Sequence, residues 1–243
     1  LRKMGDSLSE RIDAIERFAG DVAHELKNPL ASLSSTNELL EKYSRDKTFT
    51  RHVARQADDI ARMDRLITDI MNDARLDSEL AGALTEKVEL KAMLKTLVSV
   101  YNETGMSKTT QLIFKNEDKQ EYTIYGDEHK VARVFQNLID NAIAFSPPNG
   151  VISILLSSEK GLANIMVEDN GPGILQQNLE KIFKPFVTDN PQDQKFGNHS
   201  GLGLSIARKI IRRHGGMIWA ENRGVSHEQT TGSRFIVTLP LAL

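Results

Sequence analysis

The first third of the chain repeats its apolar residues every seven positions, and this repeat limits what the segment can fold into. The intervals alternate between three and four residues, with Gly5 in the single slot that lacks an apolar side chain. The repeat comprises Leu1, Leu8, Ile12, Ile15, Ala19, Val22 and Leu26. Because a helix turns once in about 3.6 residues, this spacing predicts one apolar seam along a long α-helix.

A second helical stripe follows a polar break at residues 43–47. Its apolar residues again lie three or four apart: Val53, Ala57, Ile60, Met63, Ile67, Ile70 and Ala74. Two long helices joined by a short connection predict a helical hairpin. A single hairpin is too thin to bury both stripes, so pairing with a second copy is expected, giving a homodimer with a four-helix bundle.

After residue 82 the apolar pattern changes from helical spacing to short alternating runs. Strands are expected at 111–114, 122–125, 151–156, 163–167, 217–220 and 234–239. A short strand leading into a helix is expected at 88–101, and further helices at 127–145, 176–183 and 202–213. This order predicts an α/β two-layer sandwich with helices on one face of a mixed sheet. The domains are therefore placed at residues 1–82 and 83–243.

Composition excludes several classes of function. The net charge of -2 argues against a nucleic-acid-binding protein, which normally carries a basic excess. The absence of cysteine excludes disulfides and thiolate metal sites. No apolar run approaches the roughly 18 residues that cross a bilayer. Because the chain begins at Leu1, it is expected to be a fragment, so any membrane span would lie in an upstream segment.

The segment His24-Glu25-Leu26-Lys27-Asn28-Pro29 carries the first candidate site. With Leu26 at heptad position a, His24 falls at position f and faces solvent. A free imidazole has a pKa of about 6.5, so at neutral pH it is mostly an uncharged nucleophile. Glu25 can accept its proton, Asn28 can position a water, and Pro29 bends the helix beside it. The alternative interpretation is an ordinary surface histidine.

Two asparagines share a face of the helix expected at 127–145. Asn137 and Asn141 are four residues apart, which places them one turn from each other. Amide oxygens are hard ligands that suit Mg²⁺ with its phosphate and water ligands. The alternative is a pair of solvent-facing asparagines.

A tight turn follows the strand expected at 163–167. Asp169, Gly171 and Gly173 form an Asp-x-Gly-x-Gly sequence, in which the glycines allow a ligand to approach the backbone closely. A buried aspartate at a strand end can accept a hydrogen bond from an amino group such as that of adenine. An ordinary turn is the alternative.

A second glycine-rich segment precedes the helix expected at 202–213. In the run Ser200–Ser205, Gly201, Leu202 and Gly203 lead into the helix, where free backbone N–H groups and the helix dipole favour phosphate. The run matches neither the dinucleotide fingerprint nor a P-loop. Alone, it is also consistent with a purely structural helix start.

The order of these four segments resembles that of sensor histidine kinases of two-component systems, across essentially the whole chain. The run Ile182-Phe183-Lys184-Pro185-Phe186 matches the phenylalanine box that this family has between its two glycine-rich boxes. The resemblance implies a dimerisation and phosphoacceptor bundle followed by the ATP-binding fold shared with gyrase and MutL.

Residue by residue, the resemblance implies a complete phosphotransfer site. His24 would be the phosphoacceptor, Glu25 the base, and Asn28 the residue that assists dephosphorylation of the partner. Asn141 would bind Mg²⁺ with Asn137 nearby, and Asp169 would bind the adenine amino group. The remaining matches would shape the nucleotide pocket and its lid: Gly171, Gly173, Gly201, Leu202 and Gly203.

The sequence departs from the family at two positions that often carry a basic residue. These are Ala144 and Thr188, and the first would otherwise contact ATP phosphates. Lys184 or Lys195 could compensate. Of the remaining histidines, His199 is expected in the lid and His214 on the surface. No two histidines have zinc-ligand spacing.

The resulting hypothesis is ATP-dependent phosphorylation of His24, followed by transfer to an aspartate of a response-regulator receiver domain. Asn28 suggests phosphatase activity as well. In this family such a core is the cytoplasmic part of an inner-membrane sensor. Two alternatives stay open: a kinase-silent dimeric scaffold that senses nucleotide, motivated by Ala144, and a clamp ATPase of the gyrase and MutL type.

Overall fold

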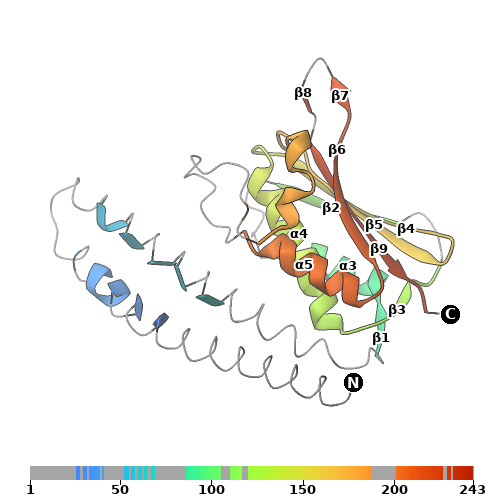
Figure 1. Cartoon of the computed structure of the whole chain (residues 1–243), viewed down its shortest axis with the longest axis horizontal. Helices are drawn as coiled ribbons and strands as arrows, with labels where there is room; N and C mark the ends of the chain where they lie inside the picture. Colours follow the sequence, from blue (N-terminus) through green and yellow to red (C-terminus); the bar gives the residue numbers. More distant parts are fainter. Residues whose placement is uncertain are drawn as a thin grey trace, which may run out of the picture. The chain divides into compact units, whose positions relative to one another are not determined.

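The computed structural model describes part of the chain, and its contacts divide the whole chain into two compact units. The described residues are 26–27, 30–31, 33–38, 40, 52–54, 56–57, 60–61, 63–64, 67–68, 86–104, 110–116, 120–185, 187, 201–226, 229–230 and 232–242. One unit contains Leu1–Gly82 and Gly197–Ser200, and the other contains Ala83–Phe196 and Gly201–Leu243. Figure 1 shows the chain coloured along its sequence, with the helices and strands of the second unit labelled.

The described residues of the first unit that lie between positions 26 and 68 are helical. Leu30 and Ile67 are buried against each other, with Ile60 packed beside them. Val53 is also buried, so Val53, Ile60 and Ile67 form a stripe with seven-residue spacing. Apolar burial therefore holds the two helical runs together.

Polar contacts give the direction of the two runs. The side-chain amide of Asn37 donates to the backbone carbonyl of Val53 at 3.4 Å. Nearer the start of the first run, the Lys27 ammonium lies 3.8 Å from the Asp64 carboxylate. Since a later residue of the first run contacts an earlier residue of the second, the runs are antiparallel. The predicted helical hairpin is confirmed for these described residues.

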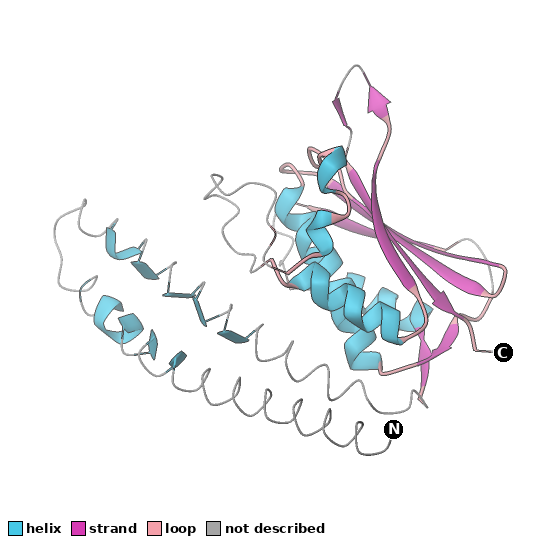
Figure 2. Cartoon of the chain, viewed as in Figure 1, coloured by secondary structure: helices cyan, strands magenta, loops and turns pink. Residues whose placement is uncertain are grey.

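The second unit is built on a five-stranded sheet covered by helices on one face (Figure 2). In spatial order its strands are β2 (Gln111–Lys115), β4 (Val151–Glu159), β5 (Leu162–Glu168), β9 (Ser233–Pro240) and β6 (Met217–Asn222). The helices are α3 (Leu90–Glu103), α4 (Glu128–Phe145) and α5 (Gly203–Arg213). Only the β2–β4 pair is parallel, so the predicted mixed sheet is confirmed.

Two smaller pairs of strands complete the second unit. β1 (Lys87–Glu89) pairs with β3 (Thr123–Tyr125), and β7 (Val225–Ser226) pairs with β8 (Gln229–Thr230). β2 and β3 are consecutive in the chain but belong to different sheets. The β7–β8 pair was absent from the sequence-based expectations, because two-residue strands are too short to show an alternating pattern.

α4 is the central helix of the unit, and its sequence specifies both its face and its ends. Six apolar residues are almost completely buried: Val131, Val134, Phe135, Leu138, Ile139 and Ala142. Asp127 caps its start by accepting a hydrogen bond from the Lys130 backbone N–H at 3.1 Å. The helix ends at Phe145, before the two prolines that cannot continue it.

The prediction of a helix at 176–183 was wrong. This segment forms two single-turn 3₁₀-helices, η1 (Gln176–Asn178) and η2 (Lys181–Phe183). Only Ile182 and Phe183, both in η2, are buried. Eight residues with so little buried surface cannot offset the cost of starting an α-helix. The loop expected at 192–200 lies outside the described residues, and none of the described helices is long and apolar enough to cross a membrane.

Candidate functional site

Asp169 follows β5 directly and is the most enclosed polar group among those predicted site residues that the structure describes, with 2% of its surface exposed. Its Oδ1 accepts hydrogen bonds from the backbone N–H groups of Gly171 at 2.7 Å and Ser233 at 3.0 Å. Its Oδ2 accepts from the Ser233 hydroxyl. A carboxylate has about four lone-pair positions, so these three bonds leave one on Oδ2 for a further donor.

The turn after Asp169 requires glycine. A Cβ on Gly171 would lie 2.6 Å from the carbonyl oxygen of Phe145 and 3.0 Å from Asp169 Oδ1. Gly173 has a φ of 79°, in the left-handed region that side chains disfavour. The predicted tight turn is therefore observed, and it brings the end of α4 next to the end of β5.

Sequence reasoning missed two residues that complete the surroundings of Asp169. Ser233 supplies two of its three hydrogen bonds, and a Cβ on Gly232 would lie 2.0 Å from the Asp169 carbonyl oxygen. Ser233 is the first residue of β9 and Gly232 precedes it, and both lie beside Asp169 because Glu168 pairs with Arg234 across the sheet. The available signal was the Gly-Ser pair at the start of the last strand, but its relevance depends on the β5–β9 pairing.

The neighbouring carboxylate has different partners. Glu168 Oε1 accepts from the Arg234 guanidinium at 2.6 Å, and its other oxygen lies 3.8 Å from Arg223 Nε. Arg223 also donates to the backbone carbonyl of Asp169 at 3.0 Å. Glu168 is thus engaged by arginines, whereas the Asp169 side chain is held by the backbone and Ser233.

Asn137 lies half-buried on α4 and reaches across to α5. Its Nδ2 donates to the backbone carbonyl of Gly203 at 3.0 Å. A Cβ on Gly203 would lie 3.3 Å from the Asn137 carboxamide, which is tighter than ordinary van der Waals contact. The structure therefore joins two predicted site segments, the asparagine face of α4 and the glycine-rich start of α5.

Asn141 lies one turn further along α4 and is also half-buried. Asp140, between the two asparagines, accepts a hydrogen bond from the Tyr101 hydroxyl on α3 at 2.7 Å. Burial raises the pKa of Tyr101, and the Asp140 hydrogen bond and charge act in the same direction, so Tyr101 stays a donor. Asp140 is thereby directed toward α3.

The residues present fit a magnesium ion that arrives with a nucleotide. The described part of the chain has no group of three or more His, Cys, Asp or Glu side chains able to hold a metal. A carboxamide oxygen such as that of Asn141 would supply one hard ligand. The ion's other ligands would then have to come from water and the phosphates of the nucleotide.

The start of α5 has the features expected of a phosphate-binding turn. Gly201 has a φ of 73°, and the N-cap residue Leu202 is buried and makes no side-chain hydrogen bond to the first turn. The Ser205 hydroxyl donates to the Leu202 carbonyl at 2.8 Å, so it does not cap the N–H groups either. A helix start without a side-chain cap leaves N–H groups that can face an anion.

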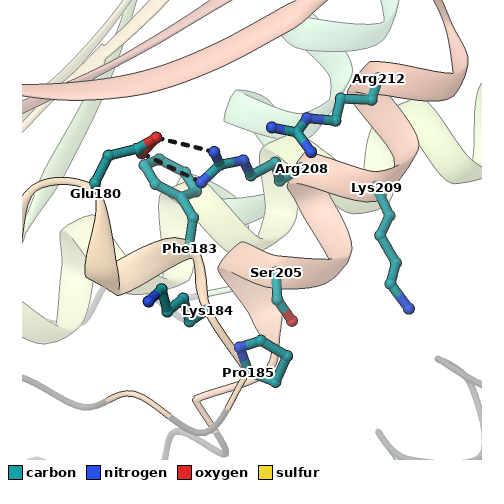
Figure 3. A pocket seen from close by; sticks show the side chains of 8 residues that line it. All are labelled: Glu180, Phe183, Lys184, Pro185, Ser205, Arg208, Lys209 and Arg212. Atoms are coloured by element: carbon teal, nitrogen blue, oxygen red, sulfur yellow. Dashed lines mark hydrogen bonds and ion pairs between the residues drawn. The ribbon is translucent and has the colours of Figure 1, made fainter.

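A cavity of about 360 Å³ lies beside η2 and α5 (Figure 3). Four of the residues that line it are basic: Lys184, Arg208, Lys209 and Arg212. The other four are Glu180, Phe183, Pro185 and Ser205. The Arg208 guanidinium binds the Glu180 carboxylate at 2.9 and 3.2 Å and lies 5.3 Å from the centre of the Phe183 ring. No residue of α4 lines this cavity, so its basic residues surround α5 rather than Ala144.

Several predicted residues lie outside the described part of the chain: His24, Glu25, Asn28, Thr188, Lys195 and His199. One expectation about a histidine was wrong. His214 is not on the surface but buried at the end of α5, with 6% of its surface exposed. Its ring accepts a hydrogen bond from the Asp127 backbone N–H, which directs it inward.

Two family models match the chain in the order that the motifs suggested. The model described as "His Kinase A (phospho-acceptor) domain" matches residues 14–79. The model described as "Histidine kinase-, DNA gyrase B-, and HSP90-like ATPase" matches residues 126–243, the part that contains Asp169, both asparagines and both glycine-rich turns.

Among curated proteins, the chain is similar to the sensor protein ChvG of Rhizobium meliloti (strain 1021). The two are 41% identical over 246 residues, which cover 99% of this chain and 43% of ChvG. The chain therefore spans less than half the length of this relative.

Three solved structures are similar to this chain. The nucleotide-free catalytic domain of the histidine kinase ThkA is 30% identical, with a TM-score of 0.54, and the match covers 64% of this chain and 95% of that domain. ThkA in complex with the response regulator TrrA is 25% identical, with a TM-score of 0.64, and the match covers 96% of this chain and 64% of that chain. Full-length ShkA in complex with AMPPNP shares the fold, with 21% identity and a TM-score of 0.67. This match covers 94% of this chain and 46% of ShkA.

The fold, the two matched families and these relatives agree. The chain belongs to the sensor histidine kinases of two-component systems, and it contains their phosphoacceptor and ATPase domains.

Proposed function

We propose that this chain is the catalytic core of a sensor histidine kinase. It binds ATP in residues 83–243, transfers the γ-phosphoryl group to His24 in residues 1–82, and passes it to an aspartate of a response-regulator receiver domain. The observation that carries the proposal is the buried Asp169 carboxylate, held at the end of β5 with one lone pair to spare.

Asp169 suits the amino group of adenine. Its three internal hydrogen bonds hold the carboxylate in one orientation, and the remaining lone pair of Oδ2 can accept one N–H. Gly171 and Gly173 let a flat base approach the backbone at this point. The match to an ATPase family model over residues 126–243 supports the assignment.

The phosphates would lie toward α4 and α5. Gly201, Leu202 and Gly203 present the start of α5, and Asn137 holds Gly203 in place through its backbone carbonyl. Asn141 supplies the oxygen ligand for Mg²⁺. When bound with ATP, the ion neutralises charge on the phosphates and orients the γ-phosphoryl group.

The chemistry then needs a nucleophile and a base. An imidazole nitrogen of His24 attacks the γ-phosphorus, an N–P bond forms, and the bond to the bridging oxygen of ADP breaks. Glu25 accepts the ring proton that the attack makes acidic. Such a transfer depends mainly on position and charge neutralisation.

The receiver domain is the second substrate. Its aspartate oxygen attacks the phosphorus of phosphohistidine, so the N–P bond breaks and an acyl phosphate forms. The complex of ThkA with the regulator TrrA supports a partner of this kind. Asn28 would position a water that removes the phosphoryl group from the regulator, giving phosphatase activity.

The hairpin supports a homodimer. Leu26, Leu33 and Leu40 are spaced by seven residues, and they remain 44%, 54% and 41% exposed in the single chain. Leu30 and Asn37, on the neighbouring stripe, are buried within the hairpin. A second copy would cover the exposed stripe and complete a four-helix bundle. By relation to longer sensor proteins, this core is assigned to the cytoplasmic part of an inner-membrane sensor.

The test is labelling with γ-labelled ATP and Mg²⁺. Wild type should acquire a label that is lost in acid and stable in alkali, and His24→Ala should acquire none. His52→Ala is the matched control, because His52 is an exposed histidine of the same hairpin. Equal labelling of wild type and His24→Ala would overturn the assignment. Tight ATP binding without any label on the protein would favour the kinase-silent scaffold. ATP hydrolysis without any label would favour the clamp ATPase.

A further inference from the structure

His214 is the only histidine in the described part of the chain that is buried. It caps the end of α5, and its ring packs against the backbone at Gly126, just before α4. A Cβ on Gly126 would lie 2.6 Å from both ring atoms Cδ2 and Nε2. Only glycine therefore lets the imidazole come this close to the start of α4.

Both ring nitrogens of His214 have backbone partners, and these partners define its state. Nδ1 lies 2.8 Å from the Ile210 carbonyl oxygen, which can only accept, so Nδ1 carries the hydrogen. Nε2 receives the Asp127 backbone N–H at 3.3 Å, so Nε2 must carry a lone pair. The contacts fit the neutral ring with hydrogen on Nδ1 and no other form.

The ring connects the two helices that carry the nucleotide-binding residues. α4 and α5 are antiparallel, and polar contacts join them at two points: His214 with Asp127, and Asn137 with Gly203. With a rise of about 1.5 Å per residue, Asn141 lies about 21 Å along α4 from Asp127. Any effect of His214 on Asn141 would therefore have to act through the position of α4.

We propose that His214 is a positioning residue that fixes the start of α4 against the end of α5, and that it does so only as a neutral ring. A proton on Nε2 would place two donors, the ring N–H and the Asp127 N–H, face to face. The first turn of α4 would then separate from the end of α5, and the nucleotide-binding residues on the two helices would be held less firmly. This consequence for binding rests on the proposed ATP-binding function.

The groups around the ring determine the direction of the pH effect. Burial lowers the pKa of His214, the Ile210 carbonyl and Asp127 oppose that shift, and Lys130 and Arg213 add to it. Although burial alone would raise the pKa of Asp127, its hydrogen bonds and ion pair with Lys130 hold it below the usual value, so its negative charge is kept. Because the folded pKa of His214 is depressed, its stabilising contribution is complete above about pH 6.5 and is lost as the pH falls below that.

The experiment compares wild type with His214→Gln in the full chain at pH 7.5 and 5.5. The glutamine Oε1 can accept the Asp127 N–H and cannot be protonated. Amide hydrogen exchange, corrected for the intrinsic rate, should show that residues 127–131 lose protection at pH 5.5 in wild type and keep it in the variant. Affinity for a fluorescent ATP analogue should fall about five- to tenfold in wild type and much less in the variant. His129→Gln, at an exposed position of α4, should behave as wild type.

The exchange measurement does not depend on ATP, so it distinguishes the two proposals. If no variant binds ATP at either pH, the ATP-binding function fails, yet exchange still tests His214. Equal loss of protection in wild type and His214→Gln would overturn the role of His214. If the variant does not fold, nitrogen NMR of wild type decides, because hydrogen on Nε2 at pH 7.5 would contradict the proposal and hydrogen on Nδ1 would support it.

Discussion

α4 and the first helical run of the hairpin both carry an apolar stripe, but they bury it to different extents. Six apolar residues of α4 are at most 1% exposed within a single chain. In the hairpin run, Leu30 is buried whereas Leu26, Leu33 and Leu40 are not. The ATPase unit thus completes its core alone, and the hairpin buries only one of two neighbouring stripes. The difference indicates that the hairpin needs a partner and that α4 does not.

The largest expected effect comes from Leu33→Glu. A charge at this position would be buried in the proposed dimer, and burying an unpaired charge is costly. We expect the dimer dissociation constant to rise more than about 100-fold, measured by analytical ultracentrifugation. Ser35→Glu, two residues or about 200° around the same helix, is the control and should leave the dimer intact.

If Leu33→Glu still forms the dimer, the exposed leucine stripe is not the interface. That result would contradict the conclusion that the hairpin needs a partner to cover this stripe. Labelling of His24 should also fall in this variant if one chain's ATPase unit phosphorylates the other, and should persist if transfer stays within one chain.

Phe135→Ala in α4 tests the other claim, that the ATPase unit completes its core within a single chain. Phe135 is completely buried, so its truncation should lower the free energy of unfolding of the ATPase unit by about 3–5 kcal/mol. The dimer should persist because the hairpin is unchanged. Denaturant unfolding measures the first effect, and Gln136→Ala, at an exposed neighbouring position, is the control. A dimer lost along with the ATPase core would show that the two units are not independent.

The smallest effect is expected from Gly203→Ala. Alanine favours a helix interior over glycine by about 1 kcal/mol and has less effect at this first helical position, so thermal stability should change little. The added Cβ would press on Asn137, and ATP affinity should fall about threefold. The double variant with Asn137→Ala should show a non-additive loss, since the two residues are in contact. Additive losses in a nucleotide titration would mean that the contact does not matter for binding.

The sequence predicted the elements whose residues show a clear period. The apolar spacing of α4 and the alternation in β4 and β5 led to the correct helix and strands. The turn after Asp169 was also predicted, because its glycines are adjacent in the chain. These features depend on neighbours within a few residues.

Features that depend on distant pairing could not be predicted in the same way. Ser233 lies 64 residues from Asp169, and only the β5–β9 register brings it there. His214 follows two arginines and resembles a surface residue, but the turn at the end of α5 directs it onto Gly126. Its burial depends on the absence of a side chain 88 positions earlier. The roles of His24, Glu25 and Asn28 stay predictions.

The most direct measurement is the mass-spectrometric identification of the phosphorylated residue after incubation with ATP and Mg²⁺, in wild type and in Asp169→Asn. Asparagine would present an NH₂ group to the adenine amino group, so nucleotide binding should be lost. We predict a phosphoryl group on His24 of wild type and none in Asp169→Asn. Phosphorylation of a different residue, or equal phosphorylation of both proteins, would contradict this account.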